Sequence, residues 1–393
     1  MRKNIFTGVS LVALSAGMAH AGGFELQTLD TSMMYAEGNQ ASISHASLDA
    51  SIEGYNTAAE ALGLPSKRQV VKDQTVTNVN AKFDVGDRIS FGLGTYRAGS
   101  IQLSGGNEAP TPGVSPGGNL APTADVDLDT NALMARYNLN DNFSFIGGIT
   151  QNSIKGGNVT TLAGSYDVAS ESSTGYIGGV AYSIPEIALR AELTYQPKTK
   201  FATTTAFTPS AVGICGAAAA DGADCTVPAV YGAYLTNMTT TASATTLSLP
   251  DTLALNFQTG IAENTLMTAS YRKASWGKSQ INIAAPISIG TTFSDSTAYS
   301  VGIGRKFSES FSASLTYSKE EGSSSTSTSL FTVSNGSEAV SIGLQYKSDN
   351  ITVSGGISRR NVGDVTVTDP AAGQMKYTGN SVTAMGVKVA FAF

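Results

Sequence analysis

Few side chains in this sequence have the types and spacing that catalysis or metal binding requires. The chain has only two histidines, His20 and His45, and His20 falls within the export signal described below. A hydrolase that pairs serine with histidine needs the nucleophile within hydrogen-bond reach of the ring, and no glycine-flanked serine lies near His45. We therefore expect no enzyme, no cofactor and no metal site.

The only cysteines, Cys215 and Cys225, stand ten residues apart. In an exported protein this spacing favours a single disulfide that closes a small loop. Two free thiols remain the alternative.

The first residues have the order of a secretory signal peptide. Met1-Arg2-Lys3 is basic, residues 5–16 are largely apolar, and Ala19-His20-Ala21 provides a small-x-small cleavage site. The apolar stretch is shorter than the ~20 residues of a membrane helix. We predict a signal peptide over 1–21 and a mature chain that begins at Gly22.

The composition narrows the class of protein. Only 14% of the residues are charged, against roughly 25% in an ordinary soluble domain. The chain also holds 42 glycines, and its net charge of −6 argues against nucleic acid as a partner. No later segment is apolar for long enough to form a membrane helix. An outer-membrane barrel and a secreted β-solenoid or adhesin are the two classes that fit.

Strands are indicated by a period of two. Residues 311–318, 340–347 and 351–354 alternate apolar residues with Ser, Thr, Gly, Gln or, at position 347, Lys. Strict alternation is typical of a strand with one apolar and one polar face. The polar face carries small uncharged side chains, which suits a crowded, wet barrel lumen, and the apolar face would then meet lipid.

Short turns alternate with long loops along the chain. Tight polar turns are predicted at 85–88, 140–142, 183–186, 262–264, 308–310 and 348–350. Long polar stretches separate them, as the extracellular loops of an outer-membrane barrel separate its periplasmic turns. Six turns, with one further strand at each end, predict an all-β fold: a 14-stranded antiparallel transmembrane β-barrel. We place the barrel over 65–393, with its first two strands within 66–84.

Residues 22–64 lack clean alternation and carry acidic residues among small ones. We expect this segment to form an N-terminal plug, or hatch, inside the lumen; a disordered periplasmic extension is the alternative. Phe24 and Leu26 are candidate ligand-binding residues, because an apolar solute needs apolar side chains within the plug or lumen. Met267, Ala269 and Tyr271 form the apolar, outward face of one predicted strand, so strand alternation predicts that Arg272 points into the lumen. There it could hold a solute carboxylate or pair with acidic residues of the plug.

Several motifs resemble the FadL family of outer-membrane transporters for long-chain fatty acids and aromatic hydrocarbons. The mature start Gly22-Gly-Phe24-Glu-Leu26 resembles the family's plug opening, and Leu247-Ser-Leu-Pro250-Asp251 resembles a family strand. The resemblance implies a junction between plug and barrel at Asn56, Thr57 and Ala58, where the family usually has Asn-Pro-Ala. This chain lacks that proline. The family's first plug residues line a pocket and shift to release ligand.

We therefore expect a multi-pass protein of the bacterial outer membrane, monomeric and surrounded by lipid and lipopolysaccharide. The expected function is a channel for passive uptake of hydrophobic small molecules, with long-chain fatty acids as the first expectation. The alternatives are an aromatic hydrocarbon transporter of the same type, an aqueous porin, and a surface structural barrel.

Overall fold

The computed structural model describes residues 24–57, 67–104, 122–161, 163–283, 287–369 and 373–393. Fourteen antiparallel strands form a closed barrel. They are β1 (Gln40–Ser51), β4 (Gln74–Val85), β5 (Ile89–Ser104), β6 (Thr123–Asn138), β7 (Phe143–Thr160), β9 (Glu171–Ile184), β10 (Leu189–Gln196), β13 (Thr252–Ala262), β14 (Thr265–Ala274), β17 (Ser296–Lys306), β18 (Phe311–Glu320), β20 (Ser337–Ser348), β21 (Ile351–Val362) and β24 (Ser381–Ala392). The last strand closes the barrel by pairing with the first, with Phe391 opposite Ala41.

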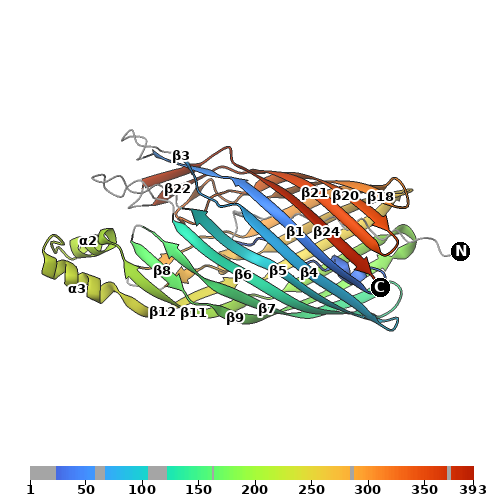
Figure 1. Ribbon diagram of the computed structural model, residues 1–393, viewed down its shortest axis with the longest axis horizontal. Helices are drawn as coiled ribbons and strands as arrows, with labels where there is room; N and C mark the ends of the chain where they lie inside the picture. The colour runs from blue at the N-terminus through green and yellow to red at the C-terminus, as the bar shows by residue number, and fades with distance from the viewer. Residues whose placement is uncertain (1–23, 58–66, 105–121, 162, 284–286, 370–372) are drawn as a thin grey trace.

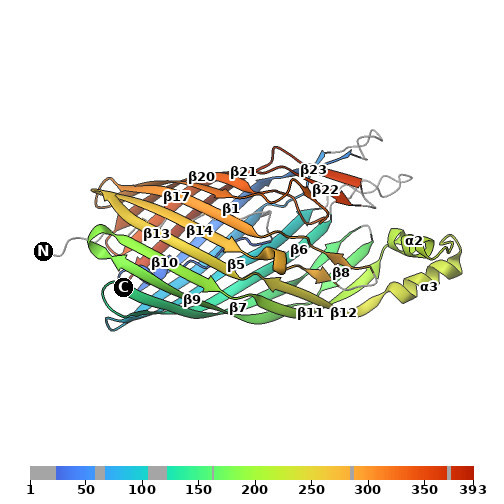
Figure 2. The ribbon, with the colours of Figure 1, turned by 180° about the vertical axis from the view of Figure 1, so that it is seen from behind.

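The turns lie where the sequence predicts them. Each of the six predicted tight turns joins two neighbouring barrel strands, and these turns and the C-terminus lie at one end of the barrel (Figure 1). The opposite end, which we call the outer end, carries the longer connections, including β8 (Gly164–Val168) and the helices α2 (Ala211–Ala220) and α3 (Pro228–Met238) (Figure 2). The 14-stranded barrel expected from the sequence is confirmed.

The prediction of the first strand was wrong. Residues 40–51, assigned from sequence to the plug, form β1 and pair with β24 on one side and β4 on the other. The expected hairpin within 66–84 is a single wall strand, β4. Alternation in β1 is obscured because three of its outward positions, His45, Ser47 and Asp49, are polar and exposed. His45 therefore belongs to the wall, where its Nδ1 lies 2.9 Å from Thr77 Oγ1.

The predicted junction between plug and barrel must move as well. Asn56 ends strand β2 (Glu53–Asn56), and the Thr57 hydroxyl donates to the Gln374 carbonyl at 3.3 Å. Both residues follow the first wall strand at the outer end, where Asn56 belongs to a small sheet. The chain instead passes from the lumen into the wall just before Gln40. Ala58 and the predicted signal peptide lie outside the described residues.

The outward side chains form an apolar belt. Val301, Ile303, Leu315, Ile342 and Leu344 occupy neighbouring outward positions and are each about half exposed. Aromatic rings lie at both edges of this belt. They include Phe83, Phe91, Phe143, Phe307, Phe311 and Phe393, with Tyr137, Tyr182 and Tyr346, towards the short turns, and Tyr176, Tyr195, Tyr271, Tyr299 and Tyr317 towards the outer end. Such a belt with aromatic edges is the surface that a lipid bilayer requires.

Two groups of short elements extend the outer end. Strands β11 (Thr199–Pro209) and β12 (Thr240–Leu249) form a hairpin that carries α2 and α3, and β15 (Asn282–Ile283) and β16 (Ile289–Gly290) continue beside it. A second sheet joins β2, β3 (Lys67–Gln69), β19 (Thr326–Ser327), β22 (Val365–Asp369) and β23 (Gly373–Tyr377). None of the helices within the described ranges combines the length and apolar character of a membrane-spanning helix.

The position of the belt predicts how much a charged side chain on the outer face destabilises the folded barrel. We expect Ile303→Lys, near the middle of the belt on β17, to destabilise the folded barrel by about 2–4 kcal/mol. Thr297→Lys lies on the same face of the same strand, beyond the Tyr299 ring at the outer edge, and should cost about 0–1 kcal/mol. Reversible urea unfolding in lipid vesicles measures both. Equal costs for the two variants would contradict this placement of the belt.

Candidate functional site

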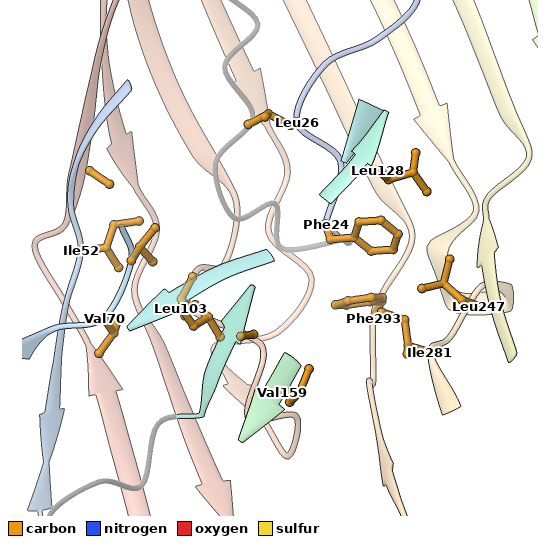
Figure 3. Close-up of a cluster of buried hydrophobic side chains, with 14 of the residues drawn as sticks. Phe24, Leu26, Ile52, Val70, Leu103, Leu128, Val159, Leu247, Ile281 and Phe293 are labelled. Carbon is orange, nitrogen blue, oxygen red and sulfur yellow. The ribbon is translucent and has the colours of Figure 1, made fainter. Parts of the chain in front are cut away.

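Three aromatic rings meet inside the outer half of the barrel. The Phe24 ring centroid lies 5.0 Å from that of Trp276 and 6.4 Å from that of Phe293, and the Trp276 and Phe293 centroids are 5.5 Å apart. Trp276 is completely buried, and the two phenylalanines are 7% exposed. Leu128, Leu247 and Ile281 extend the same apolar cluster, as Figure 3 shows around Phe24. We call Phe24, Trp276 and Phe293 the aromatic cluster.

Phe24 is held there by backbone hydrogen bonds to β5. Leu26 N donates to the Ala98 carbonyl and Ser100 N donates to the Phe24 carbonyl, both at 2.9 Å. The register of β5 against β6 shifts between Arg97 and Gly99, so the strand bends at this point. A Cβ at Gly99 would lie 2.6 Å from the Phe24 ring, so only glycine lets the plug approach this closely.

These bonds also replace a missing part of the wall. Strand β4 pairs with β5 only from Val79 opposite Thr95 to Val85 opposite Ile89. Towards the outer end the two strands separate, and the chains meet again at an isolated bridge between Val71 and Leu103. Within this interval, residues 24–26 bond to the β5 edge that β4 leaves open. The start of the plug is therefore both a filler of the lumen and a short strand on the wall.

A buried ion pair lies next to Phe24. Arg272 Nη2 is 2.5 Å from Glu25 Oε1, and the two side chains are 17% and 15% exposed. Arg272 belongs to β14, across the lumen from β5, and it points inward as its alternation predicts. Removing one partner of a buried pair leaves an uncompensated charge, which is strongly destabilising. The pair therefore keeps the start of the plug against the wall.

The following plug residues are fixed in the half of the barrel nearer the short turns. Met33 and Met34, in the short helix η1 (Ser32–Tyr35), pack against Met134, Ile146 and Ile177 on the wall. Gly92 leaves the space for Met34, because a Cβ there would lie 2.3 Å from the methionine sulfur.

Wall cations and one wall carboxylate fix the same stretch. The guanidinium carbons of Arg136 and Arg190 lie 4.8 and 4.1 Å from the centroid of the Tyr35 ring. Lys82 Nζ donates to the carbonyls of Ala36 and Gly38 at 2.7 and 3.0 Å, and the Thr31 hydroxyl donates to Glu192 at 2.5 Å. The plug is thus joined to several strands around the lumen.

The structure brings together the three ligand-binding candidates named from sequence. Phe24, Leu26 and Arg272 all lie within this one region, and Leu26 is 2% exposed. Trp276 follows the end of β14, in η3 (Trp276–Lys278), and its side chain turns inward to the aromatic cluster, away from the edge of the belt. Tyr271 does lie at the edge, 5.5 Å from Tyr299. Phe293 was not identified from the sequence, because this residue lies in an irregular connection where strand alternation cannot predict which way a side chain points.

Cys215 and Cys225 are joined by a disulfide, with their Cα atoms 5.2 Å apart. The bond ties α2 to the segment that leads into α3, at the outer tip and away from the aromatic cluster. No three His, Cys, Asp or Glu side chains gather at one place in the described part of the chain to hold a metal ion.

Comparisons with solved structures give the same fold. A Pseudomonas aeruginosa FadL homologue superposes with a TM-score of 0.70 at 14% identity, over 96% of this chain and 98% of that one. The toluene transporter TodX of P. putida gives 0.61 at 12% identity, over 92% of each chain. The Ralstonia pickettii toluene transporter TbuX gives 0.61 at 11% identity, over 96% of each. No family model and no curated protein matches the sequence. The resemblance seen in the sequence motifs is thus confirmed at the level of the fold.

The single tryptophan allows the ion pair to be tested. Arg272→Met leaves Glu25 buried without a partner, and breaking such a pair costs about 3–5 kcal/mol when burial is complete. We expect the start of the plug to detach, so that acrylamide quenches Trp276 fluorescence much more strongly than in the unaltered protein. The double variant Glu25→Gln/Arg272→Met removes both charges and should stay close to the unaltered protein. Quenching unchanged by Arg272→Met would show that the pair does not hold the plug.

Proposed function

We propose that this protein is an outer-membrane channel for the passive uptake of hydrophobic compounds, and that it is not an enzyme. The observation that carries the proposal is the aromatic cluster, an apolar site inside the lumen that is completed by the plug's own Phe24. A ring that belongs to a detachable segment occupies space that an apolar solute of similar size could take. The fold supports the proposal, because solved proteins of this shape are named as toluene transporters.

The interrupted wall provides the route that such a solute needs. A compound that binds in the aromatic cluster displaces residues 24–26, and the β5 edge from Ala98 to Ser100 then loses its hydrogen-bond partners. The interval between β4 and β5 opens near the outer edge of the apolar belt, because Val79 and Thr95 mark that edge on these strands. An apolar solute can leave sideways into lipid there without crossing the polar half of the lumen nearer the short turns.

Two solute classes fit this site. Long-chain fatty acids are the first expectation from the sequence, and their carboxylate would take Arg272 from Glu25 by a charge-assisted hydrogen bond. Uncharged aromatic hydrocarbons are the second candidate. They are favoured by the three-ring composition of the cluster and by the occupation of Arg272 in the closed state. One structural neighbour is named as a monoaromatic hydrocarbon channel, which supports this second candidate.

Arg272 distinguishes the two solutes. A hydrogen bond to a charged group contributes about 1.5–3 kcal/mol, so loss of the guanidinium should lower transport of a carboxylate roughly ten- to hundredfold relative to a neutral solute. The measurement is the ratio of oleate to toluene uptake into vesicles, because detachment of the plug affects both solutes and cancels in the ratio. If Arg272→Met and the unaltered protein give the same ratio, fatty-acid binding at Arg272 is excluded.

The porin and surface-structure alternatives are tested by removing the plug. A mature chain without residues 22–38 keeps β1 and its pairing with β24 and β4, and it should conduct far more ions in planar bilayers than the intact protein. Deletion through residue 45 is not a suitable variant, because it removes half of β1. An aqueous porin predicts high, steady conductance before the deletion. A purely structural barrel predicts no uptake of either solute by the intact protein.

A further inference from the structure

A second site lies at the outer end, apart from the aromatic cluster. It is a cavity of about 280 Å³, near the lower limit of ligand pockets. Ten residues line it, and every one is serine or threonine. They come from three segments: the irregular connection between β16 and β17 that holds Thr292 and Ser294, the connection between β18 and β20 that includes Ser327 and Thr332, and Thr368 on β22.

We propose that this cavity, which we call the hydroxyl cavity, binds an uncharged polyhydroxylated group such as a sugar residue. Each hydroxyl in the lining can both donate and accept a hydrogen bond, so the cavity matches a ligand whose own hydroxyls have both roles. An ion would meet no opposite charge there, because no charged side chain belongs to the lining. A purely apolar group would form no hydrogen bonds with the lining hydroxyls.

The walls of the cavity are fixed before any ligand arrives. Asn335 Oδ1 accepts hydrogen bonds from the backbone N–H groups of Ser323 and Ser324 at 2.8 and 3.2 Å. The Ser327 hydroxyl donates to Thr332 Oγ1 at 3.0 Å. Strand β19 also pairs in parallel with β22, with Ser327 opposite Val367. Binding would therefore cost little ordering of the loop.

The third segment is anchored by the aromatic cluster. Phe293 stands between Thr292 and Ser294 and points the opposite way, into the barrel, where it meets Phe24 and Trp276. The connection thus presents Thr292 and Ser294 to the cavity and the Phe293 ring to the lumen. The two sites share a backbone but no lining side chain, so the hydroxyl cavity stands as a site whichever solute the channel carries.

The source of the sugar follows from the position of the cavity. It lies beyond the tyrosine edge of the belt, at the end opposite the short turns, and in an outer membrane this end faces the saccharide of lipopolysaccharide. A soluble saccharide has the same chemistry, so the experiment must distinguish the two sources.

The test is saturation-transfer NMR on the full mature protein in lauryldimethylamine oxide, a detergent without a sugar headgroup. The probes are methyl α-glucoside, methyl α-mannoside and the core oligosaccharide released from lipopolysaccharide, with inorganic phosphate as the charged comparison. We expect transfer to at least one saccharide and none to phosphate. Transfer to the core oligosaccharide alone identifies the membrane as the source, and transfer to the methyl glycosides identifies a soluble sugar.

Two variants connect the signal to the cavity. Thr332→Val and Ser327→Ala each remove one hydroxyl from the lining, and each should weaken saccharide binding about three- to tenfold. Thr174→Val removes a hydroxyl from an outward position on β9, outside the cavity, and should leave binding unchanged. Circular dichroism and electrophoretic mobility without heating check that every variant is folded. Absence of transfer to all three saccharides, or equal transfer in the folded cavity variants and the unaltered protein, overturns the proposal.

Discussion

The structure depends on the satisfaction of backbone hydrogen bonds in a medium that offers none. A chain surrounded by lipid must pair every N–H and carbonyl internally, and a strand sheet can do so only by closing on itself. The pairing of β24 with β1 supplies this closure. With the edges gone, side-chain alternation separates an apolar outer face from a polar lumen, and the short turns and long connections fall at opposite ends.

The same requirement explains the plug. Where β5 bends away from β4 the wall leaves backbone groups without strand partners, and residues 24–26 supply them from inside. Because these bonds come from a segment that is not itself a wall strand, they can be exchanged without unfolding the barrel. The polar lumen then provides independent attachments further along the plug, through Lys82, Arg136 and Arg190. In the proposed function, the first residues of the plug move while these attachments keep the rest in place.

The two halves of the lumen hold the plug in different ways. The aromatic cluster lies in the outer half beside the Arg272–Glu25 ion pair, whereas Lys82, Arg136 and Arg190 surround the plug nearer the short turns. In the proposed function, a hydrophobic solute binds at the aromatic cluster in the outer half, next to the interrupted wall. This arrangement favours a sideways exit into lipid over passage along the whole barrel axis.

The sequence by itself determined the barrel, because alternation and turn chemistry are local and each strand carries its own signature. The six turns, the strand number and the inward direction of Arg272 follow from it. It failed for β1, whose exposed His45, Ser47 and Asp49 hide the alternation. Only the tertiary structure decided what meets inside: Glu25 pairs with Arg272 across 247 residues, and Phe24 reaches Trp276 and Phe293. Such contacts depend on which strands face one another across the closed lumen, and local sequence patterns do not predict which strands these are.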